Sequence, residues 1–217
     1  MSTQSIASHK YCRYCGNSVA EFWQTEDCMR FFYSDDTPIC KNCHQSAVQD
    51  DTALLAAWKF VVQSCMELGL HATWGDVKVR LRNAPKMKEM SGGHGILGLA
   101  KSQALGSQLT SDITILHGMP LNHTIGVLAH EAGHVFCFEY GIAFKPLEVE
   151  EGFCNVVACL VIQRLPAYLC PDDRVKALFA DQHPVYGLRF KQEWMKVNRY
   201  SWSKYLMQVK TLKDKSI

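Results

Sequence analysis

Residues 123–141 read HTIGVLAHEAGHVFCFEYG, an apolar stretch that contains the pentapeptide HEAGH. Its apolar residues recur at three- and four-residue spacing, which predicts a buried helix over about 122–140. Residues four apart share one face of a helix, so His130 and His134 can both reach a single metal ion. Glu131 stands beside the first histidine and could act as a general base. The pattern H-E-x-x-H therefore favours a zinc site, with an ordinary core helix carrying two histidines as the alternative.

A third ligand is expected from a second helix, because one class of catalytic zinc site combines two histidines with a glutamate. The stretch LEVEEGFCNVVACLVI has helical spacing over about 148–165 and an acidic start. Glu151 is the favoured ligand, since Asn155 follows one turn later and could orient a histidine through its other ring nitrogen. Glu150 is then a supporting residue or a contact for a substrate amine. The alternative is that these acidic residues merely suit the helix dipole.

Two C-x-x-C pairs predict a second metal site near the N-terminus. The stretches YCRYCG and ICKNCH supply Cys12, Cys15, Cys40 and Cys43. Four thiolates presented by two tight turns complete the closed shell of a structural zinc site. Cys28 and His44 are close enough in the sequence to replace one of the four. The alternatives are accidental pairs or a redox C-x-x-C, which usually stands beside a βαβ pattern that is missing here.

The distribution of apolar residues predicts an α+β fold in two parts. The first fifty residues hold five cysteines and little continuous apolar sequence, so residues 1–48 are expected to form a small zinc-ribbon or LIM-like knuckle that folds around metal. Residues 49–217 read as a mainly helical domain with a small mixed β-sheet. The expected elements are a helix closed by Gly69, strands at WGDVKVRLR and SDITILHGMP, a glycine-rich loop or edge strand at SGGHGILGLA, and helical segments over about 172–180 and 185–210.

Composition excludes several classes of partner. A formal net charge of +2 with 20% charged residues gives no excess of positive charge that would favour nucleic-acid binding. The longest near-apolar run, FCNVVACLVI, is too short to cross a bilayer, and MSTQSIASHK has no apolar signal core. Ten cysteines without such a signal fit reduced thiols, so a cytoplasmic protein is expected, with neither membrane nor nucleic-acid partners.

Three stretches carry a resemblance to gluzincin metallopeptidases: ITILHGMPLNHTIGVLAHEAGH, LEVEEGFCNVVA and HPVYGLRF. More narrowly, the chain resembles the DA-one-like family of plant organ-size-control peptidases, in which a LIM-type zinc module precedes a ubiquitin-activated HExxH domain. The resemblance implies a gluzincin-type peptidase domain, two zinc ions, and protein or peptide substrates. It also implies ubiquitin-linked regulation. In this family pattern His130, His134 and Glu151 hold the catalytic zinc while Glu131 activates water.

The resemblance also draws attention to HPVYG and GILGLAK. His183 or Tyr186 could donate a hydrogen bond to the oxyanion that forms when water attacks a peptide carbonyl, although a tyrosine at a helix start is commonly just packed. The segment GILGLAK could form an edge strand that pairs with an extended substrate. Both assignments need geometry that a sequence does not contain.

The leading hypothesis is a zinc-dependent peptidase, with endopeptidase favoured and aminopeptidase open because Glu150 could anchor a free amino terminus. The alternative is a non-catalytic zinc-binding adaptor protein with a degenerate peptidase fold. The intact trio of His130, Glu131 and His134 argues against degeneration, since an inactive relative has no chemical need of Glu131.

Overall fold

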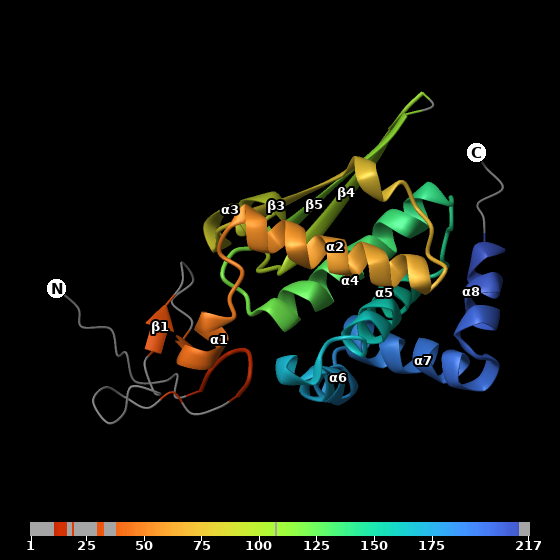
Figure 1. The fold of residues 1–217 in the computed structure, drawn as a ribbon. Helices are drawn as coiled ribbons and strands as arrows, with labels where there is room; N and C mark the ends of the chain where they lie inside the picture. Colours follow the sequence, from red (N-terminus) through yellow and green to blue (C-terminus); the bar gives the residue numbers. More distant parts are fainter. Residues whose placement is uncertain (1–10, 17–18, 20–29, 33–37, 107, 213–217) are drawn as a thin grey trace.

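The computed structural model describes residues 11–16, 19, 30–32, 38–106 and 108–212 (Figure 1). The fold is α+β and mainly helical, with a small sheet, which confirms the class expected from the sequence. Within the described ranges, no helix is both long and apolar enough to cross a membrane.

Three strands form one mixed sheet, as expected. They are β3 (Val77–Arg82), β4 (Gly98–Leu105) and β5 (Gln108–Leu116). The central strand β5 runs parallel to β3 and antiparallel to β4. The glycine-rich segment thus leads into β4, which lies at the edge of this sheet and confirms the edge strand that was expected there.

Six longer helices build the rest of the large core. They are α2 (Asp51–Glu67), α4 (Leu121–Glu139), α5 (Glu148–Ile162), α6 (Pro171–Ala180), α7 (Arg189–Tyr200) and α8 (Trp202–Lys210). Short 3-10 turns cover Trp74–Asp76 and Ala167–Leu169. In Figure 1 the sheet lies on one side of α2 and α4, and α5 lies on the other side of α4, followed by α6 and α7. The helix that carries HEAGH is therefore the central layer of the molecule.

The helices α4 and α5 approach each other closely at Gly133. A Cβ atom at this position would lie 2.8 Å from the Cys154 Sγ and 3.1 Å from the Cys154 Cα, both on α5. On either side of this glycine, Ala132 and Phe136 are buried in the core. The close crossing brings the HEAGH helix within reach of the acidic start of α5.

The N-terminal part is a small unit joined to the start of α4. Its elements are β1 (Arg30–Phe32), β2 (Pro38–Cys40), which pairs antiparallel with β1, and α1 (Lys41–Gln45). The Val48 amide donates to the Met119 carbonyl at 2.8 Å, and the Gly118 amide donates to the Val48 carbonyl at 2.9 Å. The His123 Nε2 lies 3.2 Å from the Tyr14 carbonyl and donates to it. The four-cysteine region is thereby attached to the first turns of α4.

Two local features differ from the sequence expectation. Helix α3 (Ala84–Met90) was not predicted, although Asn83 caps it by accepting from the Lys86 amide at 3.1 Å. The segment 185–210, expected as one helical stretch, is divided at Ser201, where φ is +70°. It begins instead with a π-helical turn, Pro184–Leu188, before α7. The hydrophobic period continues across the break, so it could not locate the break.

Candidate metal centre

His130, His134 and Glu151 converge at the crossing of α4 and α5. The His130 Nε2 lies 3.1 Å from one Glu151 oxygen, and the His134 Nε2 lies 3.7 Å from the other. The two histidine Nε2 atoms are 3.2 Å apart. All three residues offer ligand atoms within 4.8 Å of one another. The structure thus places Glu151, rather than Glu150, among the converging atoms.

Asn155 fixes which nitrogen of His130 carries the proton. Its Nδ2 donates to the Tyr186 carbonyl at 3.0 Å, and a carbonyl can only accept, so the Asn155 oxygen must face His130. That oxygen lies 2.9 Å from the His130 Nδ1, which therefore donates. In the neutral imidazole the His130 Nε2 is left with a lone pair directed at the cluster.

Glu150 likewise fixes which nitrogen of His134 carries the proton. One of its carboxylate oxygens lies 2.8 Å from the His134 Nδ1, so this nitrogen donates and the Nε2 of the neutral ring carries a lone pair. Two lone pairs facing each other at 3.2 Å repel unless a cation lies between them. Two imidazole nitrogens and a carboxylate are a donor set that zinc accepts, so these residues fit the expected metal.

The electrostatics of the cluster also favour a positive charge. Burial lowers the pKa of His134, but hydrogen bonds to Glu150 and Glu151 outweigh this effect and raise it to about 10. Burial raises the pKa of Glu151, whereas its contacts with both histidines hold it well below its usual range. The cluster therefore attracts a cation in the form of either a proton or a metal ion.

Glu131 is buried between the metal cluster and the edge strand. Its side chain is 7% exposed, and its Oε2 accepts a hydrogen bond from the Ala100 amide on β4 at 2.7 Å. Burial raises the pKa of this carboxyl group, although His130 and His134 oppose the shift. A Cβ atom at Gly98 would lie 2.6 Å from the Glu131 Oε1, so the glycine leaves room for the carboxylate.

An open cleft of about 700 Å³ contains this cluster. The edge strand β4 forms one wall, and side chains of α4 and α5 form the floor. Arg174 and Leu178 on α6, together with Asp181 and Tyr186, also line the cleft. An extended peptide could lie in this cleft with its backbone along β4.

Tyr186 and His183, the two oxyanion-donor candidates, are placed differently. Tyr186 lines the cleft with 46% of its surface exposed. Burial and the charges of Glu151 and Glu131 raise the pKa of its phenol, which therefore stays protonated and able to donate. His183 is not part of the cleft lining, and its Nδ1 accepts the Val185 and Tyr186 amides at 3.3 Å each. His183 thus caps the π-helical turn that carries Tyr186.

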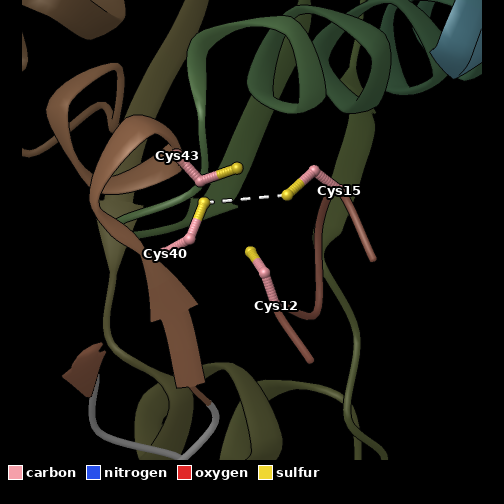
Figure 2. A group of neighbouring side chains, drawn as sticks. All are labelled: Cys12, Cys15, Cys40 and Cys43. Carbon is pink, nitrogen blue, oxygen red and sulfur yellow. Dashed lines mark hydrogen bonds between the residues drawn. The ribbon is translucent and has the colours of Figure 1, made fainter. Parts of the chain in front are cut away.

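The four predicted cysteines gather at the N-terminal site. Figure 2 shows the side chains of Cys12, Cys15, Cys40 and Cys43 directed toward one another. The Cys15 and Cys40 sulfurs are 3.7 Å apart, and ligand atoms of all four lie within 4.8 Å of one another. Each of these cysteines is free of a disulfide. Cys28, considered as a substitute ligand, lies outside the described residues.

The four thiols at the N-terminal site lie so close together that their thiolate forms would repel one another, and a zinc ion would neutralise this negative charge. Burial raises the pKa of Cys12, but hydrogen bonds from the backbone of Cys40, Cys15 and Tyr14 lower it overall to about 7. Burial and the charges of the neighbouring sulfurs raise the pKa of Cys43. All four thiolates can form together only around a cation, which is the chemistry of a closed structural zinc site.

Comparison with known protein families gives a match in the central part of the chain. Residues 80–167 match the family model described as DA1-like, Protein DA1. This match supports membership of the DA1-like family. The DA1-like segment contains His130, Glu131, His134, Glu151 and Asn155. No curated protein and no solved structure matched the chain.

Sequence reasoning missed two connections at this site. The bond from Asn155 to the Tyr186 carbonyl joins α5 to the π-helical turn, and nothing in the spacing of these residues indicates it. Arg174 also lines the cleft but belongs to a separate helix with an ordinary surface pattern. Both depend on how distant segments pack, which local periodicity does not encode.

Proposed function

We propose that the chain is a zinc-dependent peptidase that hydrolyses peptide bonds of protein substrates. The observation that carries this proposal is the facing pair of histidine Nε2 atoms beside Glu151, with each Nδ1 held by Asn155 or Glu150. The DA1-like match over the same helices supports it. A site that served only to hold the fold together would not need an open cleft beside it.

A zinc ion bound here would polarise a substrate carbonyl and lower the pKa of water in the site. Glu131 then serves as the general base that takes a proton from the attacking water and passes it to the leaving amine. Burial raises the pKa of Glu131, which favours its accepting a proton from the attacking water. The Tyr186 phenol is proposed to donate to the oxyanion, since it lines the same cleft.

The substrate backbone is proposed to lie along the outer edge of β4, on the side away from β5. The Ala100 amide faces away from β5 into the cleft, where it donates to Glu131. Outward-facing groups alternate along a strand, so Gly98 and Ser102 present the same edge. Pairing through backbone groups accepts many sequences, which fits a peptidase acting on proteins.

Endopeptidase activity is favoured over aminopeptidase activity. An aminopeptidase needs a free carboxylate to hold the substrate ammonium group. Glu150 was the residue considered for this role, but it is engaged by the His134 Nδ1 at 2.8 Å. Its position supports a part in orienting His134 instead.

The competing possibility, an adaptor with an inactive peptidase fold, is less well supported. Glu131 is 7% exposed and its pKa is raised by burial, so keeping this carboxylate costs folding free energy. A scaffold protein gains nothing from that cost, whereas a hydrolase needs a base at this position.

The proposal is tested by zinc analysis together with Glu131→Gln. The parent is expected to contain two zinc ions and to cleave peptides from a mixed library. Glu131→Gln should keep both ions and lose about 10²- to 10⁴-fold in cleavage rate. Glu148→Gln changes an exposed acidic residue at the start of α5 and should cleave like the parent. Equal cleavage by Glu131→Gln and the parent would overturn the mechanism, and a single zinc ion in the parent would remove the metal centre on which it rests.

A further inference from the structure

Arg174 places a permanent positive charge in a cleft that is lined by several carboxylates. It projects from α6 and lines the same cleft as the metal centre. Among the described lining residues the carboxylate side chains are Glu131, Glu150, Glu151 and Asp181, and Arg174 is the only lysine or arginine. None of these acids forms an ion pair with it in the described part of the chain.

The Arg174 guanidinium lacks a partner within the described residues. Its Nε is buried and makes no hydrogen bond. Burial lowers the pKa of the side chain, although arginine stays charged at any physiological pH. The cleft wall around it is apolar or small, with Gly126, Ile162 and Leu178 in the lining. A partly buried guanidinium with an unsatisfied Nε would be stabilised by a bound anion.

The Arg174 guanidinium lies about one helical turn of α4 before the metal-ligand candidate His130. A Cβ atom at Gly126 would lie 4.0 Å from the Arg174 Nη2, so the guanidinium lies over this glycine. Gly126 precedes His130 by one helical turn on α4, about 6 Å along the axis. An extended peptide advances about 3.3 Å per residue. For a peptide that runs alongside α4, this axial spacing corresponds to about two residues.

We propose that Arg174 binds a carboxylate of the substrate, one or two residues from the scissile bond. This inference rests on the proposed peptidase function for the position of that bond. The guanidinium fork can bind a carboxylate through two parallel hydrogen bonds, and the apolar surroundings strengthen the contact. The carboxylate belongs either to an acidic side chain or to the C-terminus of the substrate, and both sources offer the same chemistry to Arg174.

The test uses binding, because binding does not require cleavage. Zinc-loaded Glu131→Gln protein is immobilised and exposed to two random peptide libraries, one with free C-termini and one with amidated C-termini. Retained peptides are sequenced by mass spectrometry. Enrichment of Asp and Glu in the amidated library of about tenfold identifies a side-chain carboxylate. Retention of peptides from the library with free C-termini, but not from the amidated library, identifies the terminal carboxylate.

Paired variants assign the effect to Arg174. Adding Arg174→Gln should abolish the enrichment, whereas Arg174→Lys should keep part of it because the charge remains. Lys176→Gln is the matched control, since Lys176 lies on the same helix with its side chain 78% exposed and pairs with Asp173. Thermal unfolding of each variant checks that the fold is kept.

Two results would overturn the inference. One is the absence of any preference for a carboxylate in either library. The other is enrichment that survives Arg174→Gln in a folded variant. If the enrichment follows Arg174 but the parent protein cleaves no peptide, the proposed peptidase function fails while the carboxylate site stands.

Discussion

The Asn155 side chain is hydrogen-bonded to His130, with its Oδ1 2.9 Å from the imidazole Nδ1. The same amide donates to the Tyr186 carbonyl at 3.0 Å. One side chain therefore orients a metal ligand and also positions the turn that brings Tyr186 into the cleft.

Replacing Asn155 should separate these two roles. Asn155→Ala is expected to weaken zinc affinity at the catalytic site by about 10- to 100-fold, because His130 loses its orienting acceptor. Asn155→Asp keeps an acceptor for His130 but cannot donate to Tyr186, so it should lose cleavage rate more than zinc affinity. Competitive chelator titration and kcat/KM measure the two effects.

Asn122→Ala is the control for this pair. Its amide donates to the Leu169 carbonyl at 3.0 Å, the same kind of bond at a distance from the ligands. Zinc affinity equal to the parent in Asn155→Ala would show that the amide does not orient His130.

Gly98→Ala should impair catalysis without removing zinc. The added methyl group would clash with the Val127 Cγ1 and would lie 2.6 Å from the Glu131 Oε1, so both side chains are expected to shift. We expect kcat to fall by about tenfold or more, since general-base catalysis depends on position. Gly75→Ala, in the turn Trp74–Asp76 outside the cleft lining and with no atom within 4 Å of the added methyl, should behave like the parent. Equal rates for both variants would contradict the placement of Glu131.

Cys40→Ser should remove one zinc ion and leave the other. The N-terminal unit depends on its metal because the buried apolar residues around it are few. Limited proteolysis should then cut the first fifty residues faster, while the metal centre on α4 keeps its zinc. Cys170→Ser changes an exposed cysteine and should retain two ions. Unchanged zinc content in Cys40→Ser would exclude this cysteine as a ligand.

Stability should decrease in acid through His123. Burial, the charge of Arg174 and the charge of Arg13 lower its pKa from 6.5 to about 3, although the Tyr14 carbonyl opposes the shift. In the window between these values the unfolded chain binds a proton that the folded chain does not, so stability falls as pH falls.

Urea unfolding of the parent and of His123→Gln measures this contribution. Between about pH 7 and about pH 5.5 the parent should lose about 1.2 kcal/mol more than the variant. Comparison of the two proteins cancels the pH effects that both share. An equal loss in both would show that His123 is protonated in the folded protein.

The sequence was most informative where a function requires a fixed local spacing. His130 and His134 share a helical face because they are four residues apart, and each C-x-x-C pair presents two thiols from one turn. The choice of Glu151 over Glu150 rested on Asn155 one turn later. In the structure Asn155 contacts the His130 Nδ1 and Glu151 contacts the His130 Nε2, and the role of Glu151 as a ligand stays a prediction.

Relationships between distant segments could not be read from the sequence. Arg174 reaches the cleft because α6 packs near α4 and α5, and Tyr186 does so through its bond to Asn155. The break at Ser201 was also hidden, because the apolar period persists on both sides of it. Such features follow from tertiary packing rather than from local pattern.

The close approach of α4 and α5 at Gly133 gives a stricter sequence pattern for finding relatives of this protein. A side chain there would meet both the sulfur and the backbone of Cys154 on α5, so the two helices could not keep this crossing distance. A search string of H-E-x-G-H followed by E-x-x-x-N describes a pair of helices crossing at a set distance, whereas H-E-x-x-H describes one helix alone. The longer string would reject chance pentapeptides on a physical ground that the shorter one lacks.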